Sequence, residues 1–523
     1  MRLEVNQARL CQRSIDLGPV AACGAAATLL LAACVFDWPT SRIPSDGQAP
    51  HCGNGSIDPP EDCDGDDLAQ ETCASLGYES GTLTCATNCA FDTSACTSNA
   101  VCGDSILAPD EDCDDGNLDS DDGCDDACHV EPGWACEGAP SVCTTGCGNG
   151  VCHQPGGEDH ATCPDDCGWI QVSAGDAHTC GLKADGTAWC WGANEKGQLG
   201  DSTTEPRLTP VRVGELTGVV AIATGEVHAC AIDDQGHGWC WGDNEQGQLG
   251  NGTIMPSPSP VPVAGLDGAQ TLAAGRRHAC ATTAAHEAYC WGDNDAGQLG
   301  IGNNNDMQSA ALVAVGAGLT SAIRISAGGQ HTCAAREDDT VWCWGENGQG
   351  QLGNHTSDDS SLPMAVDTAG GYLGGTILSA GWQHTCSRDI AGVAWCWGDG
   401  ADRRLGNGFT QDAQSPTLVI GIDAVTSIAA GAVHTCAVDV GGAAWCWGRG
   451  TEGQLGSGST PPSSEAVPVV DATTVRHITT GAAHSCAIIT DGTAWCWGAN
   501  GDGQLGDNSS QSTDVPVLVD DPY

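Results

Sequence analysis

The residues of this chain that could do chemistry are mainly cysteines, histidines and acidic residues. The sequence has 33 Cys, 15 His and 68 Asp and Glu, against only 17 Lys and Arg. Thiolates and imidazoles are zinc ligands, whereas crowded carboxylates are calcium ligands. This many cysteines is typical of disulfides made in an oxidising compartment, which removes the thiolates that zinc needs. We therefore weigh calcium as a ligand and expect no other cofactor.

Acidic side chains are concentrated before residue 168. Residues 51–167 contain 26 Asp and Glu and no Lys or Arg. The spacing differs from that of an EF-hand loop, because the glycine is misplaced and a cysteine interrupts the motif. The alternative to a calcium site is a solvated acidic surface that keeps a stalk soluble and extended. The candidate calcium ligands share a carboxylate or amide oxygen and lie in one short segment: Asp112, Asp114, Asp115, Asn117, Asp119 and Asp121.

The N-terminal residues have the pattern of an export signal. Arg2, Arg9 and Arg13 precede an apolar stretch, residues 20–33, that is short for a permanent membrane span. The stretch ends Leu-Ala-Ala-Cys34, which resembles the lipobox of bacterial lipoproteins.

That resemblance implies a cleaved signal over 1–33, a lipidated Cys34 and a tether over 34–50. We expect the protein in the bacterial cell envelope, in contact with the membrane only through its lipid anchor, with plain secretion as the alternative. The formal net charge of -51 argues against a nucleic acid partner, because phosphate recognition depends on Lys and Arg.

Sixteen cysteines divide residues 51–167 into three small modules. We place these at 51–100, 101–144 and 145–167, with six, six and four Cys, so that each can pair internally. Modules of this size bury too little apolar surface to fold without disulfides, although the spacing leaves the connectivity open. The middle module, with Glu-Asp-Cys113-Asp-Asp-Gly-Asn at its centre, resembles the cysteine-rich repeats of bacterial surface proteins. That family has no established enzymatic role.

From residue 168 onward the chain repeats a unit of about 50 residues. Each copy has the phrase Gly-x-x-His-x-Cys and, about ten residues later, a phrase close to Trp-Cys-Trp-Gly. A period of this length with glycine-rich turns is typical of one four-stranded propeller blade per copy. The sequence therefore predicts an all-β protein, with a seven-bladed β-propeller over 168–523 after small disulfide-rich N-terminal modules. The repeated histidines are His178, His228, His278, His331, His384, His434 and His484.

The segment Trp191-Gly-Ala-Asn-Glu-Lys-Gly-Gln-Leu-Gly200 and its counterparts resemble the regulator of chromosome condensation repeat. The resemblance covers about 168–523, and known members of that family form seven-bladed propellers. The fifth copy departs from the pattern, with Arg403 and Arg404 in place of Gly and Gln. This pair is either a drifted surface turn or a local positive binding feature.

Nine residues separate the two cysteines of every copy. If residues 184–186 form a three-residue hairpin loop, Cys180 faces Cys190 on the neighbouring antiparallel strand, close enough for a disulfide. The same arithmetic predicts a bridge in every blade: Cys180 with Cys190, Cys230 with Cys240, Cys280 with Cys290, Cys333 with Cys343, Cys386 with Cys396, Cys436 with Cys446 and Cys486 with Cys496.

Strand alternation places Trp189 and Trp191 on one face of the blade, and His178 and Cys180 on the other. We expect the tryptophans to pack between blades, with an exposed aromatic platform for sugars as the alternative. We expect the histidines to be structural hydrogen-bonding groups rather than zinc ligands, because the cysteines beside them are oxidised.

The sequence contains no nucleophile elbow, P-loop or His-Glu-x-x-His motif, so we expect no enzyme activity. We expect an exported cell-surface binding or scaffold protein that engages an extracellular protein or glycan through propeller loops. The longer loops, 301–320 and 354–376, are the expected binding loops.

Two other functions remain open. An inhibitor of an extracellular enzyme is suggested by a secreted bacterial propeller with similar repeats that blocks β-lactamases. More remotely, the eukaryotic namesake of the repeat family suggests guanine-nucleotide exchange.

Overall fold

The computed structural model describes residues 57, 62–64, 67–76, 80–86, 89–97, 102, 111–114, 124, 127–130, 134–137, 141–145, 167–313, 319–375 and 377–521. Two compact units, Met1–Ser98 and Asn99–Tyr523, make up the chain, and each is described by itself. Among the described residues, no helix is long and apolar enough to cross a bilayer.

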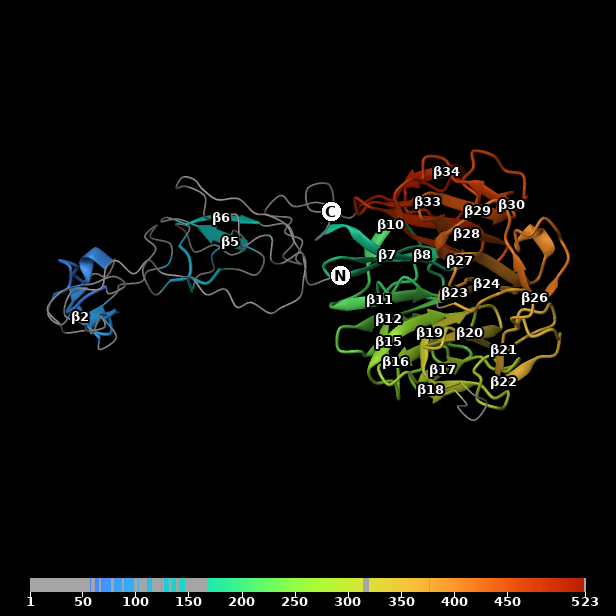
Figure 1. Cartoon of the computed structure of the whole chain (residues 1–523), viewed down its shortest axis with the longest axis horizontal. Helices are drawn as coiled ribbons and strands as arrows, with labels where there is room; N and C mark the ends of the chain where they lie inside the picture. The colour runs from blue at the N-terminus through green and yellow to red at the C-terminus, as the bar shows by residue number, and fades with distance from the viewer. Residues whose placement is uncertain are drawn as a thin grey trace, which may run out of the picture. The chain divides into compact units, whose positions relative to one another are not determined.

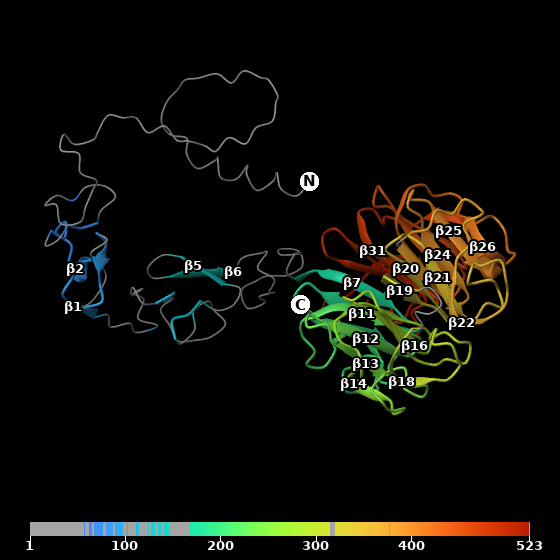
Figure 2. The ribbon, with the colours of Figure 1, turned by 60° about the horizontal axis from the view of Figure 1, so that its bottom comes forward.

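The described part of the first unit consists of short strands and one helical turn (Figure 2). β1 (Ser80–Gly81) pairs with β4 (Cys96–Thr97), and β2 (Thr84–Cys85) pairs with β3 (Phe91–Asp92). The 3-10 helix η1 (Ala74–Leu76) precedes them. Disulfides join Cys63 to Cys85 and Cys73 to Cys96, and all four cysteines belong to the module expected at 51–100.

In the second unit, β5 (Trp134–Glu137) and β6 (Val142–Thr145) form a two-stranded sheet before the propeller. The disulfides described here join Cys102 to Cys128 and Cys113 to Cys124. Both bridges stay inside the module expected at 101–144.

Residues 169–518 form seven four-stranded antiparallel sheets, which we call blades 1 to 7 in chain order (Figure 1). Blade 1 consists of β7 (Trp169–Ala174), β8 (His178–Lys183), β9 (Ala188–Gly192) and β10 (Arg207–Arg212). In blade 2 the strands are β11 (Val219–Thr224), β12 (His228–Asp233), β13 (Gly238–Gly242) and β14 (Ser257–Pro262). Those of blade 3 are β15 (Ala269–Ala274), β16 (His278–Thr283), β17 (Ala288–Gly292) and β18 (Met307–Leu312).

The remaining blades repeat this order. Blade 4 contains β19 (Ala322–Ala327), β20 (His331–Arg336), β21 (Val341–Gly345) and β22 (Ser360–Ala365). β23 (Ile377–Ala380), β24 (His384–Arg388), β25 (Ala394–Gly398) and β26 (Ala413–Leu418) form blade 5, with the 3-10 helix η3 (Ala401–Arg403) between its last two strands. Blade 6 has β27 (Val425–Ala430), β28 (His434–Asp439), β29 (Ala444–Gly448) and β30 (Ser463–Pro468). Blade 7 has β31 (Val475–Thr480), β32 (His484–Ile489), β33 (Ala494–Gly498) and β34 (Thr513–Leu518).

The register of the second and third strands agrees with the hairpin arithmetic. Cys180 pairs with Cys190, their Cα atoms lie 4.0 Å apart, and a disulfide joins them. The other six blades have the corresponding bridge. Gly186 adopts a positive φ of 77° in the hairpin loop, and His286 and Asp339 adopt 59° and 63° where glycine is replaced. Each bridge therefore spans a short loop of its own blade.

The two faces of a blade contact different neighbours. Trp241 of blade 2 is fully buried and shares an apolar cluster with Cys180 and Cys190 of blade 1. Its indole N–H donates to the backbone oxygen of Gln198, also in blade 1, at 3.0 Å. The tryptophan face of each blade therefore packs on the disulfide face of the preceding blade, and the predicted packing between blades is confirmed for this set of tryptophans.

The first strands of the blades line the propeller axis, where glycine permits their close approach. A Cβ atom on Gly175 would lie 2.6 Å from the backbone oxygen of Gly225, well inside van der Waals contact. Corresponding contacts continue from blade to blade and return from Gly481 to Gly175. The absence of a side chain at this position lets the inner strands meet around a narrow axis.

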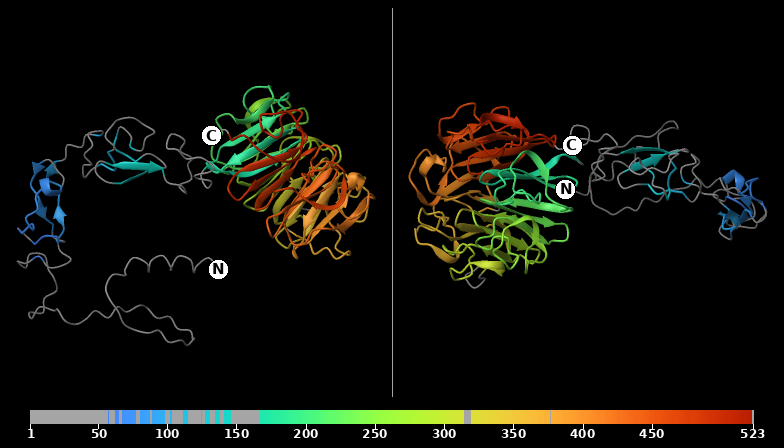
Figure 3. Two further views of the ribbon diagram at one scale, coloured as in Figure 1. Left: turned by 90° about the horizontal axis from the view of Figure 1, so that it is seen from above. Right: turned by 180° about the vertical axis from the view of Figure 1, so that it is seen from behind.

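Blades 7 and 1 are each built from a continuous segment of the chain. Contacts between these two blades close the ring. The colour sequence in Figures 1 and 3 returns from red to green at this junction. The indole N–H of Trp191 donates to the backbone oxygen of Gln504 at 3.0 Å, and the backbone N–H of Trp169 donates to the backbone oxygen of Gly492 at 2.8 Å. Closure therefore leaves neither terminal blade with an uncovered apolar face.

Candidate functional site

The propeller has two ends that the blade geometry makes different. At one end lie the turns between the first and second strands, such as residues 175–177, and we call this the mouth face. At the other end lie the short loops between the second and third strands, such as residues 184–187, and we call this the hairpin face. On the mouth face the axis opens through a narrow cavity of about 70 Å³, lined by the ends of the first strands and the turns that follow them.

One position of the turn varies widely between blades. Side chains that support the blade recur from copy to copy, so a position that holds different residue types in different copies is available for another role. The position directly after the axial glycine holds Asp176, Glu226, Arg276, Gly329, Trp382, Ala432 and Ala482. Trp382 is the one aromatic residue in this set.

Arg276 and Trp382 lie against each other at the mouth. The Arg276 guanidinium carbon is 5.2 Å from the centroid of the Trp382 ring, a cation–π contact. Arg276 Nε and Nη2 donate to the Glu226 carboxylate at 3.1 and 3.2 Å, and Arg277 Nε donates to the same carboxylate at 3.2 Å. These contacts hold the arginine in one orientation although its side chain is 41% exposed.

A depression of about 240 Å³ lies beside this pair, lined by Arg276, Gln330, Glu346, Trp382 and Gln383. Gly329 also lines it, and a Cβ atom at Gly329 would collide with the backbone oxygen of Trp382. The depression therefore combines an aromatic face, a guanidinium and amide groups.

Acidic groups at the mouth are partly removed from water. Burial raises the pKa of the Asp176 carboxyl, and the nearby Glu226 charge raises it further. Burial also raises the pKa of Glu346, with a smaller contribution from the charge of Asp359. A cationic or hydrogen-bond-donating partner group would therefore find acceptors here that water solvates poorly.

The arginine pair of the fifth copy is not a surface feature as a whole. Arg404 is only 5% exposed, and its guanidinium contacts Asp399 Oδ2 at 3.0 Å and Asp402 Oδ2 at 3.1 Å. It also donates to the backbone oxygen of Ala432 at 2.9 Å. Neither the drifted surface turn nor the free positive feature describes Arg404, because its charge is buried and compensated. Arg403 has a positive φ of 67° where the other copies have glycine.

The repeated histidines are buried at blade interfaces. His278 Nε2 lies 2.8 Å from Thr332 Oγ1 of the next blade, and four others make the same contact. Burial lowers the pKa of His278 to about 3, with a smaller effect of the neighbouring His331. Neutral rings held by hydroxyl groups, beside sulfurs that are in disulfides, favour the structural role over zinc.

The tryptophans of the other set, such as Trp189, are half-buried, and the Trp189 N–H donates to Thr187 Oγ1 at 2.8 Å. Each blade carries its own half-buried ring at this position, and the aromatic platform for sugars stays a prediction.

The second of the expected binding loops, 354–376, is partly structural, whereas residues 314–318 of the first, 301–320, lie outside the described residues. β22 ends at Ala365 and β23 begins at Ile377, so the extra residues lie between blades 4 and 5. The largest side chain there, Tyr372, is 1% exposed, and its ring centroid lies 6.0 Å from that of Trp395. Its hydroxyl donates to Ser387 Oγ at 2.9 Å. Tyr372 therefore fills a blade interface instead of reaching a partner.

The calcium hypothesis stays a prediction. Asp112 is exposed, and Asp114 is buried with its backbone N–H donating to Ser141 Oγ at 3.0 Å. The other candidate ligands, Asp115, Asn117, Asp119 and Asp121, lie outside the described residues, as does Cys34.

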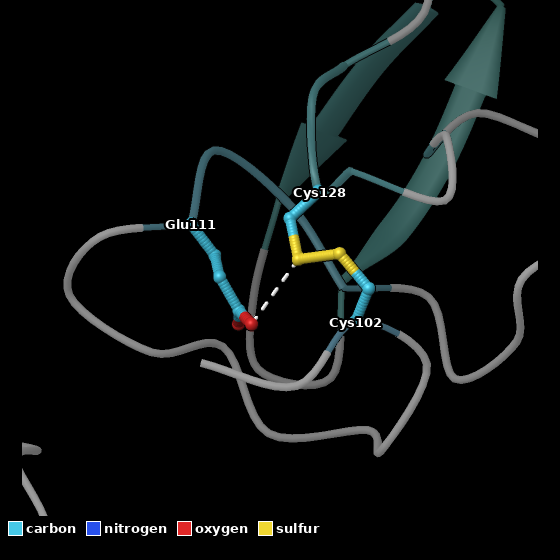
Figure 4. Close-up of side chains that lie close together, drawn as sticks. All are labelled: Cys102, Glu111 and Cys128. Carbon is cyan, nitrogen blue, oxygen red and sulfur yellow. Dashed lines mark hydrogen bonds between the residues drawn. A yellow bond between two sulfur atoms is a disulfide. The ribbon is translucent and has the colours of Figure 1, made fainter. Parts of the chain in front are cut away.

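A group of cysteines and one carboxylate lies nearby in sequence. Glu111 Oε1 is 3.1 Å from Cys128 Sγ, which is joined to Cys102 (Figure 4). Because both sulfurs are in the disulfide, this group lacks the thiolates of a zinc site.

Neither Arg276 nor Trp382 belongs to a motif that stands out in the sequence. A position-by-position comparison of the seven copies was the available signal, since Trp382 stands where other copies have charged or small residues. Their contact with each other could not be inferred, because 105 residues lie between them in the chain.

Family models match most of the propeller and part of the N-terminal region. The Regulator of chromosome condensation (RCC1) repeat matches 185–232, 235–282, 286–335, 338–387, 391–438, 441–488 and 491–523. A second model of the same description matches six segments between 169 and 504. A Domain of unknown function (DUF4215) matches 82–129, which overlaps the first two expected modules.

Curated relatives match about a fifth of this chain. The human E3 ubiquitin-protein ligase HERC2 is 34% identical over 100 residues, 19% of this chain and 2% of that protein. The Ultraviolet-B receptor UVR8 of Arabidopsis thaliana is 32% identical over 92 residues, 18% of this chain and 21% of the receptor. The Regulator of chromosome condensation of Drosophila melanogaster is 33% identical over 103 residues, 19% of this chain and 18% of that protein. The chain therefore covers about a fifth or less of these relatives.

Solved structures show the same fold. Human WBSCR16 has a TM-score of 0.57 and 20% identity, over 64% of this chain and 94% of that chain. Yeast RCC1 (Prp20), solved with Kap60 bound, has a TM-score of 0.56 and 19% identity, over 64% and 83%. At these identities the likeness concerns the fold alone.

Proposed function

The chain belongs to the regulator of chromosome condensation repeat family, and on that premise we propose that the mouth face of its propeller binds a protein partner. The observation that carries the proposal is the Arg276–Trp382 pair beside an accessible depression. Tryptophan and arginine are enriched among the residues that dominate binding energy at protein interfaces. Here both are held in place by neighbouring residues, so binding costs less ordering.

Relatives with this fold bind proteins. The structure of yeast RCC1 contains Kap60, and another Prp20p structure from Saccharomyces cerevisiae is described with binding properties to Gsp1p and histones. Those partners belong to those proteins. For this chain, the formal charge of -51 disfavours partners that approach through acidic surfaces.

We further propose that the protein works outside the cytoplasm, anchored to the cell surface through Cys34. The seven blade disulfides support an oxidising compartment, and the N-terminal pattern supports export. The partner is then an extracellular protein, and a glycan is the alternative that the test must separate. Inhibition of an extracellular enzyme is one form that such protein binding would take.

Site-specific photo-crosslinking on the full chain tests the mouth face. A crosslinking residue replaces Gln330, which lines the depression, or Gln235, an exposed glutamine on the hairpin face of blade 2. We expect a stoichiometric protein adduct from position 330 in extracts of the surface of the source cells, and none from position 235. An adduct that glycosidase removes and that yields no partner peptides assigns the site to a glycan.

Substitutions then test the pair itself. Trp382→Ala and Arg276→Ala should each lower the affinity for the captured partner by about tenfold or more. This is the effect expected of a dominant interface residue. Gln235→Ala is the matched control and should leave affinity unchanged. If all three variants bind the partner as tightly as the wild-type protein does, the mouth pair does not bind the partner.

A further inference from the structure

Each of the seven blade interfaces has an apolar position at its hairpin-face end. One interface differs from the other six in the size of the side chain at this position. Each interface forms a separate apolar cluster that includes a buried tryptophan from the third strand. Six clusters also include a large side chain at the hairpin-face end of the interface. Five of these side chains come from the connection between the two blades: Leu216, Leu266, Leu319, Tyr372 and Ile422. The sixth is Trp169, the first residue of β7, at the strand position that Val475 holds in blade 7. The cluster between blades 6 and 7 has Ala472 instead.

The connections between blades show that Ala472 occupies the same place. Leu266 lies three residues after Val263, whose N–H donates to the oxygen of Gly238 at 2.8 Å. Ala472 lies three residues after Val469, whose N–H donates to the oxygen of Ala444 at 2.9 Å. Both connections also end alike, because Ala269 and Val475 donate to the hairpin glycine of the preceding blade. The backbone of the two connections follows the same path. Ala472 therefore stands at the position of Leu266 with a shorter side chain.

A pocket lies where the missing side chain would be. It has a volume of about 280 Å³ and is lined by Val475, Ile489, Trp495, Trp497 and Pro516, with Ala472 at its wall. In the blade 4–5 interface, the ring of Tyr372 packs on Trp395 and Trp397, which correspond to Trp495 and Trp497. The pocket is therefore the same interface socket, without the large side chain that fills it between blades 4 and 5.

We propose that this socket, the Ala472 pocket, binds one leucine- to phenylalanine-sized side chain of a partner polypeptide. The six filled sockets show which chemistry fits, since aliphatic and aromatic side chains occupy them. Most of those side chains belong to a loop that connects two blades and passes over the end of their interface. This favours a polypeptide as the occupant. The pocket is also smaller than the clefts that hold drug-sized ligands. It lies at the hairpin-face end, so it is independent of the mouth face and of the function proposed above.

Ligand-detected saturation-transfer NMR on the full oxidised chain tests the proposal. The probes are N-acetyl-leucinamide and N-acetyl-phenylalaninamide, with N-acetyl-serinamide as the polar control and benzene as a small apolar molecule. We expect transfer to the leucine and phenylalanine probes with the wild-type protein and at least a fivefold loss with Ala472→Leu, which restores the large side chain. The serine probe should show none.

Leu266→Ala is the matched positive control, because it should open the equivalent socket between blades 2 and 3. In the double variant Ala472→Leu/Leu266→Ala, we expect transfer to the two apolar probes to return. We also expect Ala472→Leu to raise the thermal midpoint, as a filled cavity does. It should leave crosslinking from position 330 unchanged, so the two proposals fail separately.

Three outcomes would overturn the proposal. Undiminished transfer with Ala472→Leu would place the probes elsewhere. A lower thermal midpoint for this variant would mean that the socket does not accept a leucine side chain. Binding of benzene without binding of the acetylated amides would exclude a polypeptide as the occupant.

Discussion

His484 Nε2 lies 2.8 Å from Thr179 Oγ1, and this contact joins blade 7 to blade 1. Thr179 donates its one hydroxyl hydrogen to the backbone oxygen of Gln504 at 2.8 Å, so the hydroxyl must accept from the imidazole. The hydrogen of the neutral ring therefore lies on Nε2. The same arrangement links four further pairs of blades, whereas His178 and His228 face alanine at this position and have no ring hydrogen bond among the described residues.

A hydroxyl at position 229 should complete the arrangement at His178. Ala229→Thr places Oγ1 between His178 and the backbone oxygen of Gln198, as Thr332 does between His278 and Gln298. We expect the free energy of unfolding in urea to rise by about 1 kcal/mol, the net value of such a hydrogen bond. Ala229→Val has the same shape without the hydroxyl and is the control. Equal effects of the two substitutions would attribute the change to packing alone.

The buried histidines should make the propeller sensitive to acid. Burial lowers the pKa of His331 in the folded protein from its usual 6.5 to about 3. Between these values the unfolded chain binds a proton that the folded protein does not, so stability falls as the pH is lowered from about 6.5 towards 3. Each such histidine contributes at most about 1.4 kcal/mol per pH unit. The measurement is the urea midpoint from pH 7 to pH 4.

Two substitutions separate this effect from general acid sensitivity. His228→Gln removes one buried ring whose pKa is lowered to about 4, so the slope against pH should become shallower. Gln235 is exposed on the hairpin face and does not titrate, so Gln235→Ala should leave the slope unchanged. A slope that is the same for all three proteins would mean that the buried rings do not control acid unfolding.

Removal of a single blade disulfide should weaken the propeller without unfolding it. The double substitution Cys280→Ala/Cys290→Ala opens a loop whose ends are ten residues apart. The chain-entropy model gives a cost of up to about 3 kcal/mol for a loop of this size. Urea unfolding measures the loss, and a thiol count on the unfolded wild-type chain shows the oxidation state. If a reductant leaves the wild-type urea midpoint unchanged, the blade disulfides do not stabilise the propeller.

Lys183 and Asp521 form a buried ion pair at the junction of the first and last blades. Lys183 is fully buried, its Nζ lies 2.5 Å from Asp521 Oδ1, and it also donates to the backbone oxygen of Cys167 at 3.1 Å. Burial lowers the pKa of Lys183, while Asp521 opposes that shift. We expect Asp521→Asn to cost about 3 kcal/mol, because it removes the carboxylate charge that contacts the buried ammonium.

Lys183→Met combined with Asp521→Asn tests the physical reason. This pair of substitutions removes the charge together with its partner, so the double variant should be more stable than Asp521→Asn alone. Denaturant titration of the three proteins gives the coupling energy. A double variant that is less stable than the single one would mean that packing, and not the loss of the Asp521 charge, determines the cost.

Tyr372 should stabilise the interface between blades 4 and 5 mainly through its ring. Tyr372→Phe loses only the hydrogen bond to Ser387, at an expected cost of about 1 kcal/mol. Tyr372→Ala empties the space beside Trp395 and Trp397 and should cost about 3–5 kcal/mol. The ratio of the two losses in urea is the readout. Similar losses would show that the hydroxyl, and not the ring, fixes this connection.

Much of the blade could be predicted because its contacts are local in the chain. The nine residues between Cys180 and Cys190 permit one hairpin register, and that register determines the disulfide. Alternation along β9 then separates Trp191 from Cys190, so the packing of tryptophan between blades followed as well. The period of about 50 residues indicated one blade per copy, and the seven copies gave the number of blades.

The sites could not be predicted in this way, because they depend on contacts between blades. Arg276 and Trp382 meet only where the ring brings two turns together. The guanidinium of Arg404 reaches the backbone oxygen of Ala432 in the next blade. Ala472 is unremarkable in its own segment and leaves a pocket only because blade 7 presents Trp495 and Trp497 beside it.

Short-range periodicity thus determined the strands, their pairing and the bridge inside each blade, since those contacts span about ten residues. The tertiary structure decided what the seven copies do differently. Curvature around a common axis brings side chains from separate copies into contact, and no spacing within one copy encodes which of them will meet.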